Sequence, residues 1–295
     1  MTRDLPPVTI QSDSLGAQIS PRGAELVVLR DAQGRDLLSD GDPAFWRGKA
    51  PILFPIVGML NGGRYRLGEQ IFEMPKHGFA RRRDFAVVTH DEGPATFRLE
   101  ADEATLAVYP FRFRLDMGFA IKGACLTMTA SIANLGDGPM PTSFGFHPAL
   151  RWPLPYGQAR SGHYLTFAEP EPAPIRRIDE AGVVCPDTPP TPVEGRTLSL
   201  RDALFEDDAI IFDRLASSSL TYGADTGPKL QVDFPGAEYL GVWTKPGAAF
   251  ICIEPWWGIA DPQGYDGDFR NKPGVFEVAP GDTRHLAMSI SLTGA

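Results

Sequence analysis

The chain has 295 residues, of which 43% are hydrophobic and 22% are charged, a balance typical of a globular protein with a substantial core. The formal net charge of -9 argues against nucleic acid as a partner, because binding a phosphate backbone needs a clustered basic face. The N-terminal stretch MTRDLPPVTIQ has no apolar signal segment, and no window has the roughly 18 apolar residues of a membrane span. We therefore expect no membrane partner and a cytoplasmic location.

Alternation of apolar and polar residues predicts β-strands along the whole chain. In chain order, short runs with this pattern span residues 26–29, 71–74, 85–90, 96–100, 219–222, 230–234, 239–244 and 286–292. The longest run covers residues 113–133, where the alternation is interrupted once, at Lys122-Gly123-Ala124, and therefore predicts a long β-hairpin. Turn sequences such as DAQGRD at 31–36 and NLGDGPMP at 134–141 separate the runs.

The chain offers few candidates for helices. Its 31 glycines and 28 prolines interrupt the sequence too often for long helices, and only residues 43–47 and 198–205 have a plausible helical pattern. Residues 170–196 are rich in Pro, Asp and Glu, which predicts a long loop or a domain boundary. Because strand patterning resumes after this loop without a shift in composition, we predict one all-β domain over residues 1–295, made of antiparallel sheets.

Two of the five histidines lie in sequences that place them at the ends of strands. His77 is followed by glycine in MPKHGFARR, and His147 is followed by proline in SFGFHPALRWP. Neither glycine nor proline suits the middle of a regular strand. Strand ends and loops are where binding sites are usually built, so both histidines are candidate site residues. The alternative is that each only hydrogen-bonds a local turn. The remaining histidines have surface-like or ambiguous contexts: His90, His285 and His163.

An acid stands at the end of an apolar run in the stretch FICIEPWWGIADP, which begins at residue 250. Glu254 would be desolvated there, unless its carboxylate lies at a strand edge in water. Pro255 is expected to end the strand. Trp256 and Trp257 follow and supply an apolar wall of the kind on which the C–H face of a sugar ring stacks. Asp208 precedes another apolar triplet and is a candidate for holding a hydroxyl or orienting a histidine. Together these residues suggest proton transfer on a sugar.

The chain resembles the aldose 1-epimerase (galactose mutarotase-like) superfamily, and within it the LacX-like branch. The resemblance implies a large antiparallel β-sandwich with a sugar-binding cleft. It rests on segments that follow one another in order over nearly the full length: RGAELVVLRD at 22–31, DPAFWRGKAPILFPIVG at 42–58, MPKHGFARRRDF at 74–85, SFGFHPAL at 143–150, YLGVWTKPGAAFICIEPWWGIAD at 239–261 and KPGVFEVAPGDT at 272–283.

The resemblance also implies roles for four residues. Glu254 matches the general base that removes the proton of the anomeric hydroxyl, and His147 matches the general acid that protonates the ring oxygen. The ring then opens, the aldehyde rotates, and closure from the other face gives the other anomer. His77 matches a second histidine near the ring oxygen and hydroxyls, and Asp208 matches an aspartate that binds hydroxyls. Both steps are proton transfers, so the resemblance implies a monosaccharide aldose as the partner and no cofactor.

The sequence departs from the family at one position. Members often carry an arginine that grips sugar hydroxyls where this chain has Met59, whose thioether cannot donate a hydrogen bond. Arg64, Arg66 and Arg81 are candidates to replace it. The run at 81–83 is alternatively a site for the phosphate of a phosphorylated sugar. The identity of the sugar, and whether it carries a phosphate, therefore stay open.

Three other functions compete with an epimerase. The first is a carbohydrate-binding protein of the same fold without turnover. The second is a metal site, since two histidines and a carboxylate are common ligands, although close ligand spacing and paired cysteines are both missing. The third is glycoside hydrolysis, which needs two facing carboxylates, and Asp208 with Glu254 is the available pair. The sequence predicts no oligomeric state.

Overall fold

The structure is a computed structural model that describes residues 5–90 and 93–294, and in that part of the chain nearly all regular structure is β-strand. The prediction of an all-β fold made of antiparallel sheets is confirmed: every strand pair in the described sheets is antiparallel. None of the helices in these residues is long and apolar enough to cross a bilayer.

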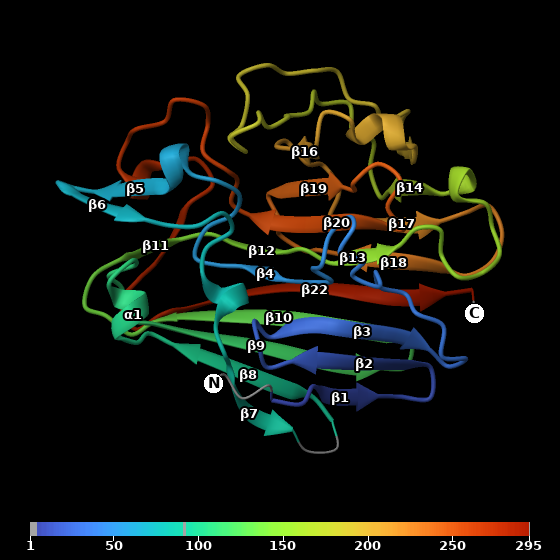
Figure 1. Cartoon of the computed structure of the whole chain (residues 1–295), viewed down its shortest axis with the longest axis horizontal. Coiled ribbons are helices and arrows are strands. Elements are labelled where there is room, and N and C mark those ends of the chain that lie inside the picture. The colour runs from blue at the N-terminus through green and yellow to red at the C-terminus, as the bar shows by residue number, and fades with distance from the viewer. Residues whose placement is uncertain (1–4, 91–92, 295) are drawn as a thin grey trace.

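The strands are numbered along the chain as in Figure 1. They are β1 (Val8–Gln11), β2 (Leu15–Ser20), β3 (Glu25–Asp31), β4 (Ile52–Leu53), β5 (Arg64–Leu67), β6 (Gln70–Glu73), β7 (Ala86–His90), β8 (Ala95–Glu100), β9 (Phe113–Lys122), β10 (Cys125–Asn134), β11 (Met140–Thr142), β12 (Phe144–Phe146), β13 (Ala149–Arg151), β14 (Tyr164–Phe167), β15 (Thr197–Ser199), β16 (Ile210–Phe212), β17 (Ser219–Gly223), β18 (Lys229–Asp233), β19 (Tyr239–Trp243), β20 (Phe250–Trp257), β21 (Phe276–Val278) and β22 (Thr283–Thr293). The helical turns are α1 (Glu103–Leu106) and the 3-10 turns η1 (Asn61–Gly63), η2 (Ala80–Arg82), η3 (Arg160–Gly162), η4 (Asp202–Phe205) and η5 (Phe269–Asn271).

Two large sheets build the sandwich. Among the described residues one sheet has nine strands in the order β15-β14-β17-β18-β22-β10-β9-β8-β7, and the other has the order β16-β19-β20-β12-β4, with β13 also pairing with β20. A three-stranded sheet, β1-β2-β3, lies across the β7–β10 end of the large sheet (Figure 1), and β5-β6 forms a separate hairpin. Buried side chains from the nine-stranded sheet, the six-stranded sheet and the three-stranded sheet belong to one continuous core.

The central hairpin β9–β10 forms where the alternation predicts it. Phe113, Leu115, Met117 and Phe119 are buried on one face, while the residues between them are half-exposed. Lys122 pairs with Cys125 across the turn. Burying each large apolar side chain stabilises the fold by about 1.5–3 kcal/mol, so the alternation fixes which face of this hairpin covers the core.

The helix predicted at 43–47 is wrong, and the one predicted at 198–205 is only partly right. Residues 43–47 form a single turn in which the Asp42 carbonyl accepts the backbone N–H groups of Phe45 and Trp46. Residues 198–205 start in strand β15, where Leu198 pairs with Leu165, and only then form the turn η4. Helix α1 was not predicted because its four residues are too short for a periodic pattern; it is held by a capping box between Asp102 and Thr105.

The long loop predicted at 170–196 is present, and it folds back over the six-stranded sheet. It contains no named strand or helix and touches the rest of the protein through isolated bridges, among them Arg176 to Ile211 and Val184 to Pro262. This loop brings Ile178 to the site described next.

Candidate active site

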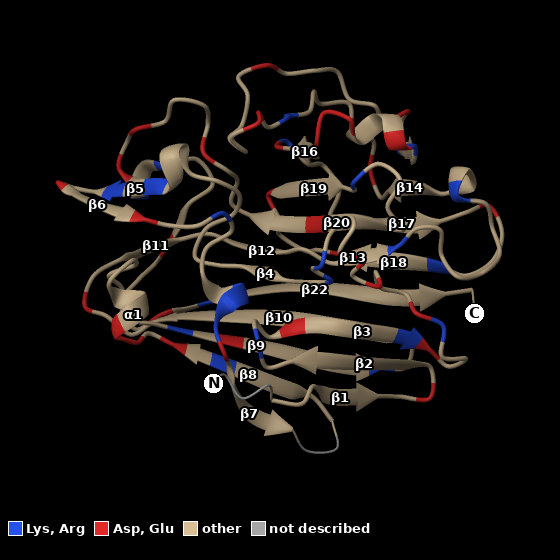
Figure 2. Ribbon diagram, in the orientation of Figure 1, with Lys and Arg blue, Asp and Glu red and all other residues tan. Residues whose placement is uncertain are grey.

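Glu254 lies in the middle of strand β20 and is 2% exposed. It pairs with Gly241 of β19, and the strand continues through Pro255, so the prediction that Pro255 ends the strand is wrong. The physical reason is a gap on the other side of β20, where β13 pairs with residues 250–252 and β12 pairs with 256–257. Among the described residues, 253–255 have no strand partner on that side, so a proline at position 255 costs no ladder hydrogen bond. Figure 2 shows one acidic segment on the otherwise uncharged ribbon of β20, and the acidic residue of that strand is Glu254.

His147 occupies the same gap, between the end of β12 and the start of β13. Its Nε2 lies 3.2 Å from Oε2 of Glu254. The imidazole ring stacks on Trp46, with ring centroids 4.8 Å apart, and meets the edge of Trp243. The position at a strand end was predicted; the direct contact with Glu254 was not, because it depends on which strands pair with β20.

Burial shifts the pKa values of this pair in opposite directions. The pKa of His147 falls to about 3, mainly because its ring is buried, with Arg81 and Lys76 adding to the decrease. Burial raises the pKa of Glu254 well above its ordinary value; Lys76 opposes this increase and Asp208 adds to it. Both shifts disfavour charge, so burial favours the form of the pair in which Glu254 holds a proton and His147 is neutral, and the two groups titrate as a unit.

His77 lies in the turn between β6 and η2, in the left-handed conformation with φ 66°. Its backbone N–H donates to the carbonyl of Gly58 at 2.8 Å, and Nδ1 accepts the backbone N–H of Gly58 at 3.0 Å. Because Nδ1 is an acceptor, the proton of the neutral ring is on Nε2. Burial holds the pKa of His77 well below its ordinary value, as do His147, Lys76 and Arg81. The ring meets that of His147 edge to face at 5.7 Å. The turn therefore presents a neutral N–H donor.

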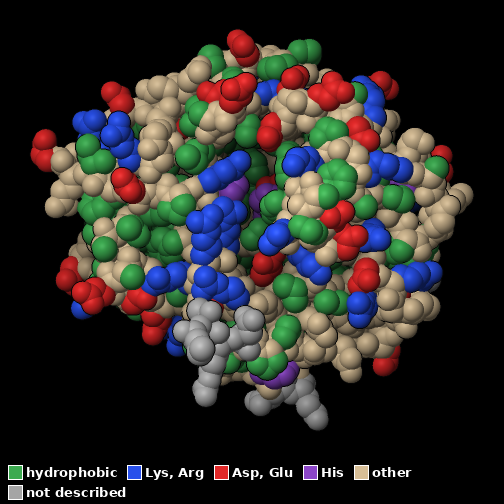
Figure 3. Space-filling model, in the orientation of Figure 1, with side chains coloured by type: hydrophobic (Ala, Val, Ile, Leu, Met, Phe, Trp, Pro, Cys, Tyr) green, Lys and Arg blue, Asp and Glu red, His purple; other side chains and the backbone are tan. Residues whose placement is uncertain are grey.

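These three side chains line a cavity of about 370 Å³. Figure 3 shows a hollow near the middle of this face, with histidine side chains in it and Lys and Arg side chains around its mouth. Asp208 lies at this cavity, exposed and with φ 62°, just before β16. The cavity is lined by Phe45, Trp46, Gly58, Lys76, His77, Arg81, His147, Ile178, Gly182, Asp208, Ala209, Ile211, Trp243, Lys245, Glu254, Trp256 and Ala260.

The two tryptophans of β20 face opposite sides of the sheet. Trp256 lines the cavity, whereas Trp257 belongs to the main core and packs against Phe146 with ring centroids 6.2 Å apart. The expectation that Trp257 contacts the substrate is therefore corrected. The reason is the two-residue period of a strand, which puts position 257 on the face opposite Glu254.

Two glycines on neighbouring strands make room for Trp256. Gly145 pairs with it from β12, and Gly241 pairs with Glu254 from β19. A Cβ atom at either glycine would lie 2.6 or 2.4 Å, respectively, from an atom of the indole. The indole therefore lies across the sheet over both glycines and presents a flat apolar surface toward the cavity.

Three cations reach the cavity, and Met59 is not among its lining residues. Lys76 and Met59 both flank Gly182: a Cβ there would meet Met59 Cβ at 3.3 Å and Lys76 Nζ at 3.9 Å. Arg81 donates from Nη2 to the carbonyl of Lys76 at 2.9 Å, and Lys245 is the third cation. The sequence interpretation missed Lys76 and Lys245, although Lys76 directly precedes His77.

The run at 81–83 does not act as one group. Only Arg81 reaches the cavity; Arg82 is exposed, and Arg83 forms an ion pair with Asp102. Arg64 and Arg66, the other candidates to replace the family arginine, line a different pocket.

The sequence interpretation also did not identify the aromatic residues Phe45, Trp46 and Trp243 as site residues. Trp243 lies two residues from Gly241 on the same strand and so shares its face, but only the pairing of β19 with β20 identifies this face as the wall of the cavity. Phe45 and Trp46 come from the turn that was predicted as a helix. No local pattern indicates where that turn packs.

His147, Glu254 and Cys252 place one potential metal-ligand atom each within 4.8 Å of one another. This differs from the predicted alternative of two histidines and a carboxylate. Burial, with a contribution from Glu254, raises the pKa of the Cys252 thiol well above its ordinary value.

Residues 6–273 match the family described as aldose 1-epimerase. The plasmid-encoded protein LacX of Lactococcus lactis subsp. lactis is 31% identical, over 97% of this chain and 99% of that protein. A galactose mutarotase related enzyme from Lactobacillus acidophilus has a similar structure, with a TM-score of 0.89, 29% identity and coverage of 98% of this chain and 97% of the other. For a galactose mutarotase-like protein from Lactobacillus casei ATCC 334 the TM-score is 0.88, with 29% identity and coverage of 97% and 99%. The fold is thus that of the galactose mutarotase-like proteins, and the chain belongs to the aldose 1-epimerase family.

Proposed function

We propose that the protein is an aldose 1-epimerase that interconverts the α and β anomers of an aldose, with Glu254 as the base and His147 as the acid. The observation that carries the proposal is their contact at 3.2 Å at the wall of one cavity. The anomeric hydroxyl and the ring oxygen are bonded to the same carbon atom, so the acid and the base that serve them must lie side by side.

The reaction needs one proton on the pair. Transfer of that proton from Glu254 to His147 across the 3.2 Å contact ionises Glu254. Glu254 then takes the proton of the anomeric hydroxyl while His147 donates to the ring oxygen. The bond between the anomeric carbon and the ring oxygen then breaks, and the open aldehyde rotates. Ring closure on the other face returns the protons by the reverse route. Each positioned proton transfer typically contributes about 10²- to 10⁴-fold.

The surrounding residues position the sugar and shift the ionisation of the Glu254–His147 pair. The Nε2–H of His77 is placed to hydrogen-bond the ring oxygen or a neighbouring hydroxyl, and Trp256 offers its indole face to the C–H side of the ring. Lys76 favours the ionised form of Glu254. Asp208, at the rim, accepts hydrogen bonds from hydroxyl groups.

A second candidate function is epimerisation of a phosphorylated aldose. It is favoured by the three cations at the cavity, Lys76, Arg81 and Lys245, which outnumber the carboxylates Asp208 and Glu254. A phosphate group would accept charge-assisted hydrogen bonds from them.

Anomer-exchange NMR tests both candidates. Freshly dissolved glucose, galactose and their 6-phosphates are each mixed with the protein, and the exchange rate is compared with that of the free sugar. We expect faster exchange for at least one sugar, and preference for a 6-phosphate would select the second candidate. Saturable binding without acceleration for any of the four would contradict both and make the protein a carbohydrate-binding protein.

A further inference from the structure

The imidazole of His147 has one polar contact with another side chain at its Nε2 atom, which lies 3.2 Å from Oε2 of Glu254. Its other ring nitrogen, Nδ1, is buried and has no hydrogen-bond partner among residues 5–90 and 93–294. In a functional histidine, a hydrogen bond at the second nitrogen commonly sets the tautomer and the orientation of the ring. Contacts with the face and the edges of the ring must therefore orient His147.

Three aromatic rings make such contacts. The indole of Trp46 stacks on the imidazole of His147, with ring centroids 4.8 Å apart and 28° between the planes. The rings of Trp243 and His77 meet the imidazole nearly at right angles, with centroids 6.1 and 5.7 Å away. Of these three rings, only the indole of Trp46 lies nearly parallel to the imidazole and so covers its face.

Trp46 is itself held by its surroundings. It is half-buried, and its indole packs on Phe250 with ring centroids 5.8 Å apart. A Cβ atom at Gly48 would come within 2.4 Å of the indole, so the backbone passes close beside the ring. The carbonyl of Asp42 accepts the backbone N–H of Trp46 at 2.9 Å. These contacts leave the indole little freedom, so it constrains the orientation of His147.

The stack also matters for the charge that His147 acquires. In the proposed reaction Glu254 passes its proton to His147, which becomes an imidazolium in a buried site. Burial opposes this charge, as do Arg81 and Lys76, and together they hold the pKa of His147 at about 3. The face of an indole attracts a cation within about 6 Å of the ring centroid, and the attraction is stronger where water is excluded. Trp46 therefore favours the imidazolium, as the carboxylate of Glu254 does.

We propose that Trp46 is a positioning residue for the epimerase reaction: its indole orients the imidazole of His147 and stabilises the imidazolium that forms when Glu254 passes on its proton. This inference rests on the proposed function and adds a residue that acts through the acid. Trp46 thus differs from Trp256, whose indole face is offered to the sugar. Loss of the Trp46 indole should lower the turnover number, whereas a change at Trp256 should raise the Michaelis constant.

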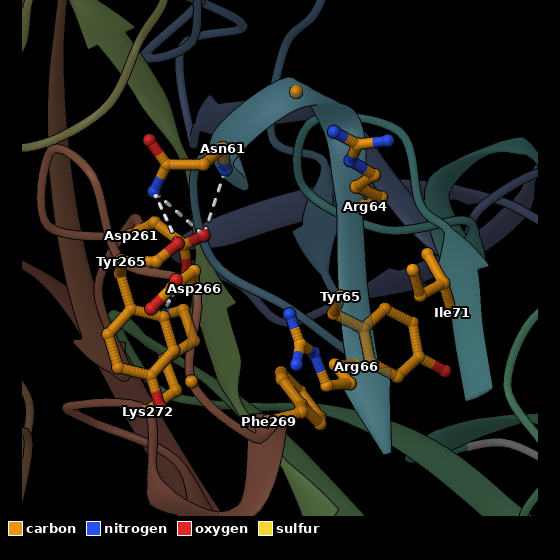
Figure 4. Close-up of a pocket in the computed structure, with 12 residues that line it drawn as sticks. Asn61, Arg64, Tyr65, Arg66, Ile71, Asp261, Tyr265, Asp266, Phe269 and Lys272 are labelled. Carbon is orange, nitrogen blue, oxygen red and sulfur yellow. Dashed lines mark hydrogen bonds and ion pairs between the residues drawn. The ribbon is translucent and has the colours of Figure 1, made fainter. Parts of the chain in front are cut away.

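Saturation kinetics of anomer exchange test the proposal, with whichever of glucose, galactose and their 6-phosphates the protein accelerates most. Trp46→Leu should lower the turnover number about 2- to 30-fold and leave the Michaelis constant within about twofold. Trp46→Phe restores an aromatic face and should be closer in rate to the unchanged protein than to Trp46→Leu. The matched control Tyr265→Leu removes an aromatic residue from a separate pocket (Figure 4) and should change neither constant.

Gly48→Ala disturbs the stack while Trp46 stays in the chain. Gly48 is not among the residues that line the catalytic cavity, but its new Cβ would displace the indole. The turnover number should therefore fall in this variant too. Combined with Trp46→Leu, Gly48→Ala should cause no further loss, because the two changes act on the same contact. Gly16→Ala, where a Cβ would have nothing within 4 Å, should react like the unchanged protein.

Four results would overturn the proposal. These are an unchanged turnover number in Trp46→Leu, a rise in its Michaelis constant alone, a Trp46→Phe variant as slow as Trp46→Leu, and an equal further loss when Gly48→Ala is added to Trp46→Leu. Each of them requires an unchanged protein that is active. Failure of the proposed function would appear differently, as no acceleration of anomer exchange by the unchanged protein.

Discussion

At the scale of single residues, His147 and Glu254 meet because the strand next to β20 is interrupted. Glu254→Gln keeps the shape of the side chain but removes the base, and His147→Ala removes the acid. We expect each variant to lose about 10²- to 10⁴-fold in the rate of anomer exchange, with sugar affinity changed only a few-fold. The exposed His285→Ala serves as a control and should retain full activity. Full activity in either site variant would refute the role assigned to that residue.

Lys76 is a second residue whose charge matters for the reaction. Its ammonium group opposes the increase in the pKa of Glu254. Lys76→Met should therefore raise that pKa further and, because the pair must keep one proton to react, move the basic limb of the pH–rate profile to higher pH. Lys245→Met also removes a cation from the cavity, but Lys245 is not among the groups that shift the pKa of Glu254, so its profile should not move. Equal shifts in both variants would mean that only the net charge of the cavity matters.

At the scale of strands, β19 controls how the indole of Trp256 lies. A Cβ at Gly241 would come within 2.4 Å of the indole, so Gly241→Ala should displace Trp256 and cost about 1–3 kcal/mol of stability. The Michaelis constant should rise more than the turnover number falls, because the indole positions the sugar and moves no proton. Gly16→Ala, on strand β2, is the matched control, because a Cβ at position 16 would have no other heavy atom within 4 Å.

Urea unfolding and anomer-exchange kinetics measure the two effects of Gly241→Ala separately. The control should unfold and react like the unchanged protein. An unchanged Michaelis constant in Gly241→Ala would contradict the role of Trp256 as a sugar platform.

The strands also show what the sequence can and cannot predict. Alternation gave the β9–β10 hairpin and its buried face, because burial in a strand is a local two-residue pattern. The same pattern would have assigned Trp257 to the core. The contact of His147 with Glu254 was beyond local patterns, since it depends on the gap between β12 and β13 facing β20. For the same reason the turn that carries Trp46 could not be assigned to the site.

At the scale of the whole molecule, buried histidines make the fold sensitive to acid. The pKa of His77 is well below 6.5, that of His147 is about 3, and that of His163 is also lowered, each chiefly by burial. Below about pH 6.5 the unfolded chain therefore binds protons that the folded chain excludes, and stability falls as the pH falls. Glu254 acts in the opposite sense, because its raised pKa lets the folded state hold a proton that the unfolded state has lost above about pH 4.5.

These contributions predict how the free energy of unfolding changes between pH 7 and pH 5. His77, His147 and His163 take up protons in the unfolded state that they exclude in the folded state, and Glu254 offsets part of this uptake. The free energy of unfolding should therefore fall as the pH is lowered from 7 to 5. Glu254→Gln removes the offset, so its slope should be steeper, by at most one proton or about 1.4 kcal/mol per pH unit. Urea unfolding at four pH values measures both slopes. Equal slopes would mean that Glu254 is already ionised in the folded protein.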